Sequence, residues 1–323
     1  MKTAKKTKND TKANIDSVSH CARVTGQNPR PGRGVPATGL AALLLFCGTL
    51  SAQPANDNKS SASGQSVQSA CVSFAACESR IMELRDAGAS GKALSLIEGL
   101  PEGELTDAAR LMKARLLLDR DRLREAAAIY EDLCGSVQSH GCWNALGVVR
   151  MSLGGYREAV AAFQKSIRIE ATARTHSNLA VAYAYLRKLN EARDHHDRAL
   201  ALDPLSIQSR LNFGVFLFNG RRFDEAGKIF TAVIADAPKD FYARLYMGRV
   251  HTMRRDYKAA LREFDRGVEL NREFFDLYYH RAVVRAKLND PGGALSDLNR
   301  ADRINPVNGL TDALRASIKS RPR

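Results

Sequence analysis

Between Trp143 and Ile169, apolar residues recur at helical spacing in two segments that flank the pair Gly154-Gly155. Two adjacent glycines interrupt a helix, so this stretch predicts a helix, a turn and a second helix. Few segments of the chain alternate between apolar and polar residues with a period of two, and strands are therefore not expected. The pattern predicts an all-α protein.

Small residues stand at unusual places within these two helices. Gly147 lies in the interior of the first helix, where glycine costs about 1 kcal/mol relative to alanine. Ala159 lies in the second helix, and Phe163 follows it one turn later. We expect Gly147 and Ala159 to mark the contact point of two crossing helices.

The same columns recur along the chain. The Ala159 position is matched, at spacings of 33 or 34 residues, by Ala126, Ala192, Ala226, Ala260 and Ala294. Four residues after each alanine stand Tyr130, Phe163, His196, Phe230, Phe264 and Leu298. Twelve residues before each alanine stand Ala114, Gly147, Ala180, Gly214, Gly248 and Ala282. Columns that stay in phase over so many copies indicate a repeated helix–turn–helix unit.

These columns resemble the tetratricopeptide repeat (TPR) family, whose unit is a helix–turn–helix of about 34 residues. One repeat carries the motif at Trp143, Leu146, Gly147, Tyr156, Ala159 and Phe163. A single hairpin cannot bury its own apolar face, so hairpins of this kind stack on one another. The resemblance implies an α-solenoid of stacked hairpins that forms a right-handed superhelix.

The repeat spacing also predicts where the chain divides. The predicted TPR array covers 107–308, with units at 107–139, 140–172, 173–206, 207–240, 241–274 and 275–308. A degenerate hairpin is expected at 74–106, before the array. Residues 309–323 should form a capping helix and a tail, with Leu310, Leu314 and Ile318 facing inward.

The N-terminal region has the pattern of an export signal. Residues 1–52 contribute +6 of the net charge of +14, and an apolar core from Thr38 to Leu50 precedes small residues. This core is shorter than the ~20 residues that a membrane span needs. We therefore expect an exported, periplasmic or envelope-associated protein, with a flexible linker at 53–73. An uncleaved signal anchor, or a lipoprotein modified at Cys47 despite the bulky Phe46 before it, are the alternatives.

No catalytic or cofactor site is evident. The sequence lacks a glycine-rich phosphate loop, a metal-ligand spacing and a nucleophile elbow, and His195-His196 is interpreted as one core and one surface histidine. We predict no catalytic residue, no metal and no cofactor. The remaining charge of +8 is spread over a long stretch of mixed signs, so a nucleic-acid partner is not expected.

The resemblance implies that the first helix of each repeat lines a concave groove. The candidate groove residues are Asn144, Val148, Met151, Ser177, Val181, Tyr185, Leu211, Val215, Phe218, Leu245 and Arg249. A face that met only water would be polar, so this apolar row indicates a peptide groove. The other interpretation is that the row packs under neighbouring repeats or against the linker. The predicted function is a non-enzymatic protein-binding scaffold of the cell envelope, in the assembly of an envelope or secretion complex.

Basic residues recur at the turns between the two helices of successive repeats. They are Arg187, Lys188, Arg221, Arg222, Arg254 and Arg255. Because equivalent positions of a solenoid form a line, these side chains can make a basic ridge that binds an anionic membrane, a wall polymer or an acidic partner. The alternative is that they are solvated turn charges without a partner.

Cysteines are the last candidate feature. Cys134 closes one repeat and Cys142 opens the next, with a short loop between them. They form either a disulfide that joins the two repeats or two small packing residues. A bond between Cys71 and Cys77 is disfavoured if a helix begins at Phe74, because six residues along a helix place the side chains on opposite sides.

Overall fold

The computed structural model describes residues 73–306 and 309–320. The basic N-terminal region, the predicted export signal and nearly all of the predicted linker at 53–73 lie outside the described residues. Fifteen α-helices and one short 3-10 helix make up the described part of the chain, which contains no strand. The all-α prediction is confirmed.

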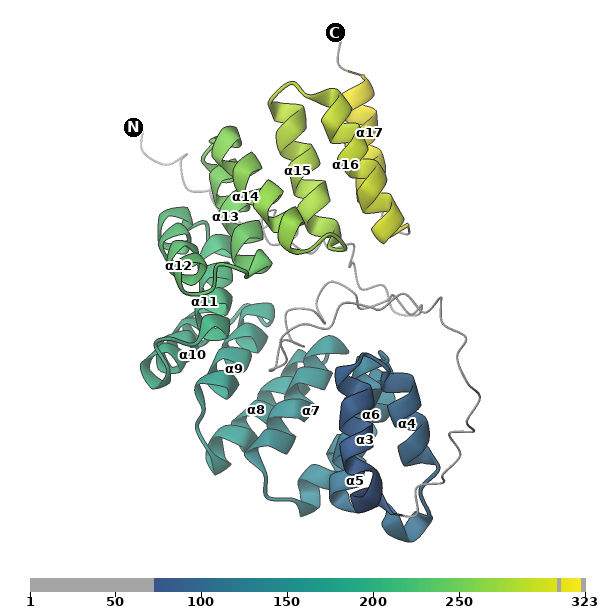
Figure 1. The fold of residues 1–323 in the computed structure, drawn as a ribbon. Coiled ribbons are helices and arrows are strands. Elements are labelled where there is room, and N and C mark those ends of the chain that lie inside the picture. Colours follow the sequence, from purple (N-terminus) through teal and green to yellow (C-terminus); the bar gives the residue numbers. More distant parts are fainter. Residues whose placement is uncertain (1–72, 307–308, 321–323) are drawn as a thin grey trace, which may run out of the picture. The chain divides into compact units, whose positions relative to one another are not determined.

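The chain divides into two compact units, and the division falls after Arg198, within α10 (Leu189–Leu202). The described part of the N-terminal unit is 73–198. It consists of the pairs α3 (Phe74–Asp86) and α4 (Ser90–Glu98), α5 (Asp107–Asp119) and α6 (Leu123–Ser136), α7 (His140–Ser152) and α8 (Tyr156–Ile169), followed by α9 (Ala173–Tyr185) and the start of α10. The 3-10 helix η1 (Glu102–Glu104) lies between α4 and α5. Within this unit the pairs pack one beside the next (Figure 1).

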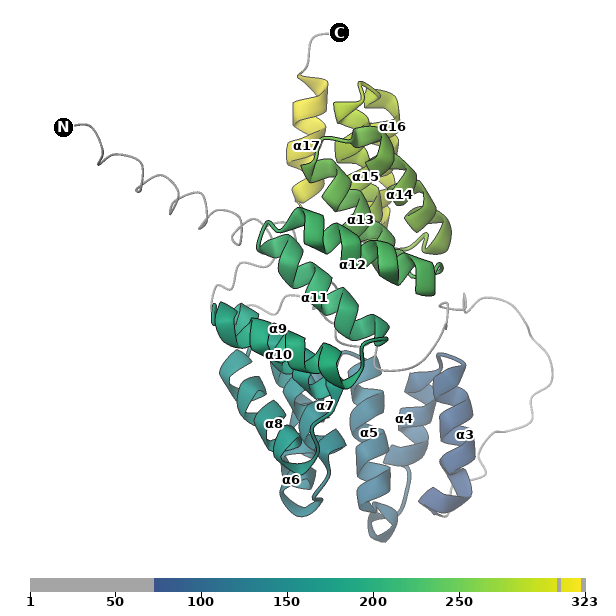
Figure 2. The ribbon, with the colours of Figure 1, turned by 90° about the vertical axis from the view of Figure 1, so that its left-hand side faces the viewer.

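The C-terminal unit, described over 199–306 and 309–320, continues the same arrangement. Its pairs are α11 (Ile207–Asn219) with α12 (Phe223–Asp236), α13 (Phe241–Met253) with α14 (Tyr257–Leu270), and α15 (Phe275–Lys287) with α16 (Pro291–Ile304). A last helix, α17 (Leu310–Lys319), packs against α16 (Figure 2). Each predicted repeat therefore contains one helix pair, and the prediction of stacked hairpins is confirmed in both units.

Polar side chains start most of the first helices. In α3, α5, α7, α9, α11 and α13, the residue before the helix accepts a hydrogen bond from a backbone N–H of the first turn. These capping residues are Ser73, Thr106, Ser139, Thr172, Ser206 and Asp240. Because the first N–H groups of a helix have no partner inside the helix, a side-chain oxygen there stabilises its start by about 1 kcal/mol.

The repeated columns form the core. The alanines of the Ala159 column are fully buried, and so are the rings of Phe163, Phe230 and Phe264. Gly214 and Gly248 face Phe230 and Phe264, since a Cβ atom on either glycine would lie 2.6 Å from the ring. First and second helices thus approach most closely at these glycines. At the C-terminal end, Ile318 of α17 belongs to the same buried cluster as Leu298. Leu314 is partly buried and packs against this cluster. Leu310 is half-buried.

The turns share one backbone conformation. The residue in the left-handed region has a φ between 57° and 80°, and the positions are Gly88, Asp121, Gly154, Arg187, Arg221, Arg255 and Asn289. Gly220, the residue after α11, has a φ of −77°, while the next residue, Arg221, takes the left-handed conformation. Three arginines therefore occupy positions where glycine would be less strained.

Candidate functional site

In the N-terminal unit, most of the predicted groove residues are buried. Val148 and Met151 belong to a cluster with Phe163 and Leu179, and Met151 is only 1% exposed. Asn144 and Ser177 are also buried, and the Oδ1 atom of Asn144 accepts a hydrogen bond of 3.1 Å from Asn178. A hydrogen-bonded, enclosed asparagine is a packing residue. Val181 is half-buried, and Tyr185 is exposed, with its ring stacked 4.6 Å from that of Tyr156.

The C-terminal unit repeats this outcome. Leu211, Phe218 and Leu245 are buried in one cluster that extends over α11 to α15. Val215 and Arg249 are half-buried.

The interpretation of the row as an open apolar groove is therefore wrong for Asn144, Val148, Met151, Ser177, Leu211, Phe218 and Leu245. First helices of successive repeats contact each other directly, as α7 does α9, α11 does α13 and α13 does α15. Apolar side chains on the sides of these helices are buried between them, which is the packing alternative. The accessible part of the row is Val181, Tyr185, Val215 and Arg249.

Arg249 is the centre of a polar and aromatic cluster on three successive first helices of the C-terminal unit. Its guanidinium carbon lies 4.7 Å from the ring centre of Phe218 on α11 and 4.8 Å from that of Tyr246 on α13. The two rings themselves meet edge to face at 5.9 Å. Contact with aromatic faces holds a guanidinium in one orientation and strengthens when water is excluded.

The charge of Arg249 acts on a carboxylate and an imidazole of the neighbouring helix α15. Burial raises the pKa of Asp276, and the charge of Arg249 lowers it in part. Burial also holds the pKa of His280 well below its usual value, and Arg249 lowers it further. Tyr242 of α13 has a raised pKa, first because of burial and then because of nearby Tyr246 and Asp276. Tyr279 of α15 also has a pKa that is raised by burial and by the charge of Asp276. Opposite charges and aromatic rings therefore share one partly desolvated face. We call it the Arg249 face, and it consists of Phe218, Tyr242, Tyr246, Arg249, Asp276, Tyr279 and His280.

Sequence reasoning found Arg249 and Val215 but missed Tyr242, Asp276 and Tyr279. Tyr242 and Asp276 stand in the first turns of α13 and α15, ahead of the columns from which the groove was counted, whereas Tyr279 is the counterpart of Leu245 in the next repeat. The available signal was the density of aromatic residues at these helix starts. Phe241 and Tyr242 lie 5.1 and 5.2 Å from Phe274, ring centre to ring centre.

The predicted basic ridge divides into paired and unpaired residues. Arg222 forms two hydrogen bonds of 2.5 Å with Glu225, and Arg254 lies 2.5 Å from Asp224. Lys188 lies 3.9 Å from Glu191 and over the ring of Tyr183. Among the described residues, Arg187, Arg221 and Arg255 form no ion pair, and all three are exposed turn residues with positive φ. The positive charge available at these turns is thus about half of what the sequence indicates.

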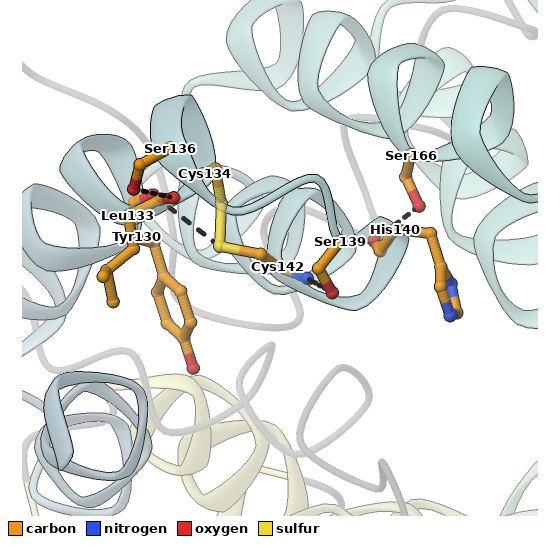
Figure 3. Close-up of a disulfide and its surroundings, with 8 residues drawn as sticks. All are labelled: Tyr130, Leu133, Cys134, Ser136, Ser139, His140, Cys142 and Ser166. Carbon is orange, nitrogen blue, oxygen red and sulfur yellow. Dashed lines mark hydrogen bonds between the residues drawn. A yellow bond between two sulfur atoms is a disulfide. The ribbon is translucent and has the colours of Figure 1, made fainter. Parts of the chain in front are cut away.

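Cys134 and Cys142 are joined by a disulfide, with their Cα atoms 5.6 Å apart (Figure 3). Both cysteines are buried, and the bond links the end of α6 to the start of α7. Cys77 is also disulfide-bonded. Cys71 lies outside the described residues, so the expectation for the pair of Cys71 and Cys77 stays a prediction.

The histidine pair separates as expected into a core and a more exposed residue. His196 is buried in the aromatic column, and the Nδ1 atom of His195 lies 2.8 Å from that of His176. The described residues contain no group of three or more side chains arranged to hold a metal ion. None of the helices described is both long enough and apolar enough to span a membrane.

Comparison with protein families decides the assignment. Tetratricopeptide repeat models match residues 140–172 and, in overlapping segments, 177–241, 211–270 and 245–308. The chain is a tetratricopeptide repeat protein. Repeats of this family suggest a protein–protein interaction scaffold.

Known proteins resemble this TPR protein in fold. It is similar to a tetratricopeptide repeat protein from Parabacteroides merdae, with a TM-score of 0.62 and 15% identity over 76% of this chain and 99% of that one. It is also similar to a chain of the APC/C hetero-tetramer Cut9-Hcn1, with a TM-score of 0.63 and 18% identity over 74% of this chain and 48% of that one. The human protein O-mannosyl-transferase TMTC3 is 24% identical over 185 residues. This stretch covers 52% of the TPR protein but 20% of the human protein, so the likeness concerns a fraction of the relative.

Proposed function

We propose that this TPR protein is a non-enzymatic scaffold of the cell envelope that binds a partner protein through the Arg249 face, in the assembly of an envelope or secretion complex. The residues assigned to the contact are Val215, Tyr242, Arg249, Asp276 and Tyr279. The observation that carries the proposal is the cluster of a ring-bound guanidinium, a desolvated carboxylate and aromatic side chains on α11, α13 and α15.

The composition of this face supports protein recognition. Arginine and tyrosine contribute most often to the energetic centre of protein interfaces, because they combine large apolar area with hydrogen-bonding ends. Arg249 and Asp276 offer both signs of charge, which lets the face fix the orientation of a bound segment. One fold neighbour belongs to a hetero-tetramer, in keeping with a role in assembly.

Site-specific photocrosslinking tests the proposal. A photoreactive amino acid at Tyr279, on the Arg249 face, should give a defined crosslinked protein in cells. The matched position is the exposed Lys258 on the second helix α14, which should give none. Equal products at both positions, or a product only at Lys258, would place the contact elsewhere.

The envelope location is part of the proposal and rests on the basic segment, apolar core and small residues at the N-terminus. Protease added to intact cells should leave the protein uncut, and permeabilising the outer membrane should expose it. A protein that stays protected after the outer membrane is permeabilised would contradict export.

A second function is favoured by one observation. Arg187, Arg221 and Arg255 occupy left-handed turn positions at a conformational cost, and all three are exposed. This is the expected arrangement if the turns dock on an anionic membrane or wall polymer. Reversal of the three charges to Glu should then abolish sedimentation with anionic vesicles, whereas a scaffold that uses the Arg249 face should not sediment with them at all.

A further inference from the structure

Three of the seven histidines of the chain lie on two helices of the N-terminal unit. His176 belongs to α9, and His195 and His196 belong to the part of α10 that precedes Ala199. We call residues 173–198 the histidine segment. His176 and His196 are buried and His195 is half-buried, and the contact between these two helices includes imidazole rings.

His176 and His195 form a direct pair. Their Nδ1 atoms lie 2.8 Å apart, and their rings stack with centres 5.1 Å apart. Tyr183 of α9 stacks on His195 from 5.5 Å. A hydrogen bond between two Nδ1 atoms requires one of them to carry a hydrogen and the other to have none. When both rings are protonated, two N–H groups point at each other and the pair is lost.

His196 occupies the column that holds Tyr130, Phe163, Phe230 and Phe264 in other repeats. It is 1% exposed, and burial, with smaller contributions from Arg193 and His195, lowers its pKa to about 3. A neutral imidazole can fill an aromatic position in a core, whereas an imidazolium there would be desolvated.

The surrounding charges do not offset this effect. Asp194 favours the charged form of His176 and of His195, but it lies 3.1 Å from Arg198, which opposes it. Arg193 is paired in the same way with Asp197 at 3.1 Å. From α8, Gln164 donates a hydrogen bond to the hydroxyl of Tyr183. Burial accordingly lowers the pKa of both paired histidines.

We propose that the histidine segment is an acid-sensitive element of the array, which opens locally when the pH falls from 7.5 to 5.5 because His176, His195 and His196 take up protons in the opened state. A repeat protein can open locally, because each repeat contacts only its neighbours and its opening does not require the whole chain to unfold. The proposal is independent of the partner-binding function.

The direction of the effect follows from linkage. A histidine whose pKa is lowered by folding stabilises the closed state above the unfolded pKa of about 6.5, and this stabilisation is lost as the pH falls below it. With a folded pKa of about 3, His196 stays neutral in the closed segment over the whole range from pH 7.5 to 5.5. His196 alone should then increase the opening equilibrium about tenfold over this range. Carboxyl groups with ordinary pKa values titrate mainly below this pH range.

Hydrogen exchange of the full-length protein at pH 7.5 and 5.5, corrected for the intrinsic exchange rates, tests the proposal. Opening of peptides from 173–198 should increase at least about tenfold at pH 5.5. Peptides from Asp107–Ser136 serve as the internal control, because this stretch of the same unit contains no histidine. His196→Phe, which restores the aromatic residue of the column, should reduce the increase about tenfold, whereas His251→Gln in the C-terminal unit should leave it unchanged.

The outcomes are distinct. The proposal would be overturned if the opening of 173–198 and that of 107–136 responded equally to pH. It would also be overturned if the variant that combines His176→Gln, His195→Gln and His196→Phe showed the same increase in opening at pH 5.5 as the wild type. If His196→Phe disturbs folding, His195→Gln takes its place: the amide can still bond to His176 without titrating, and a weaker response to pH is expected.

Discussion

The ring of Phe163 occupies the space that a side chain on Gly147 would need. A Cβ atom added to Gly147 would lie 2.4 Å from the nearest ring carbon. The ring is fully buried, so it cannot move into solvent. The close approach of α7 and α8 therefore depends on Gly147. The burial of Phe163 offsets the low helix propensity of this glycine.

Gly147→Ala should lower the free energy of unfolding by about 1–3 kcal/mol, because the added methyl group forces the ring or the helix to move. Gly135→Ala is the matched control. Gly135 lies in the neighbouring helix α6, and a Cβ atom added to it would meet nothing within 4 Å. That substitution should raise stability by about 0.5–1 kcal/mol through helix propensity. Chemical denaturation followed by circular dichroism measures both, and a shift of the same sign for both variants would refute the packing argument.

Asp297 is a buried carboxylate bound by two arginines. Its side chain is 4% exposed, and it receives hydrogen bonds of 2.9 and 2.6 Å from Arg281, while Arg285 lies 3.1 Å away. Asp297→Ala should destabilise α15 and α16 by about 2–3 kcal/mol, because Arg281 and Arg285 lose their buried partner while Asp265, 2.9 Å from Arg281, still offsets part of their charge. Hydrogen exchange of these helices is the measurement. Glu269→Ala, which removes an exposed pair with Arg266, should cost less than about 1 kcal/mol.

The disulfide between Cys134 and Cys142 closes a short loop, because the two cysteines are eight positions apart in the sequence. Loop-closure entropy predicts that Cys134→Ala with Cys142→Ala lowers stability by about 2–3 kcal/mol under oxidising conditions. Mass spectrometry of unreduced wild-type peptides provides the control by showing whether the two cysteines are linked. Equal denaturation midpoints for a linked wild type and the double variant would contradict a stabilising bond.

The left-handed turn residues give a prediction of opposite sign. Arg221→Gly should raise the free energy of unfolding by about 1 kcal/mol, because glycine adopts a φ of 61° without steric strain. The adjacent Arg222 precedes the first residue of α12 and has a φ of −83°, so glycine relieves no strain there, and Arg222→Gly should instead cost up to about 1 kcal/mol through loss of the ion pair with Glu225. Thermal denaturation distinguishes the two. A loss of stability in both variants would mean that the Arg221 side chain contributes more than its backbone costs.

Local patterns were sufficient to predict the fold. The alanine, glycine and aromatic columns report which side chains pack inside one hairpin, and those contacts are short-range in sequence. The burial of Met151 and Leu211 could not be obtained in this way, because the period shows which side of a first helix faces its neighbour but not how closely the two helices approach. Asp276 could not be predicted for a related reason: its pKa is raised by burial and lowered in part by Arg249, which lies one repeat earlier, and neither effect is visible in the sequence pattern.

The affinity of the crosslinked partner for purified protein tests the central claim most directly. Arg249→Ala should weaken binding about tenfold or more, as expected for an arginine at the centre of an interface. The control combines Arg221→Glu with Arg255→Glu, which reverses two exposed turn charges of the same unit and should change the affinity less than about twofold. Unchanged binding by Arg249→Ala together with strong loss on charge reversal would contradict recognition through the Arg249 face.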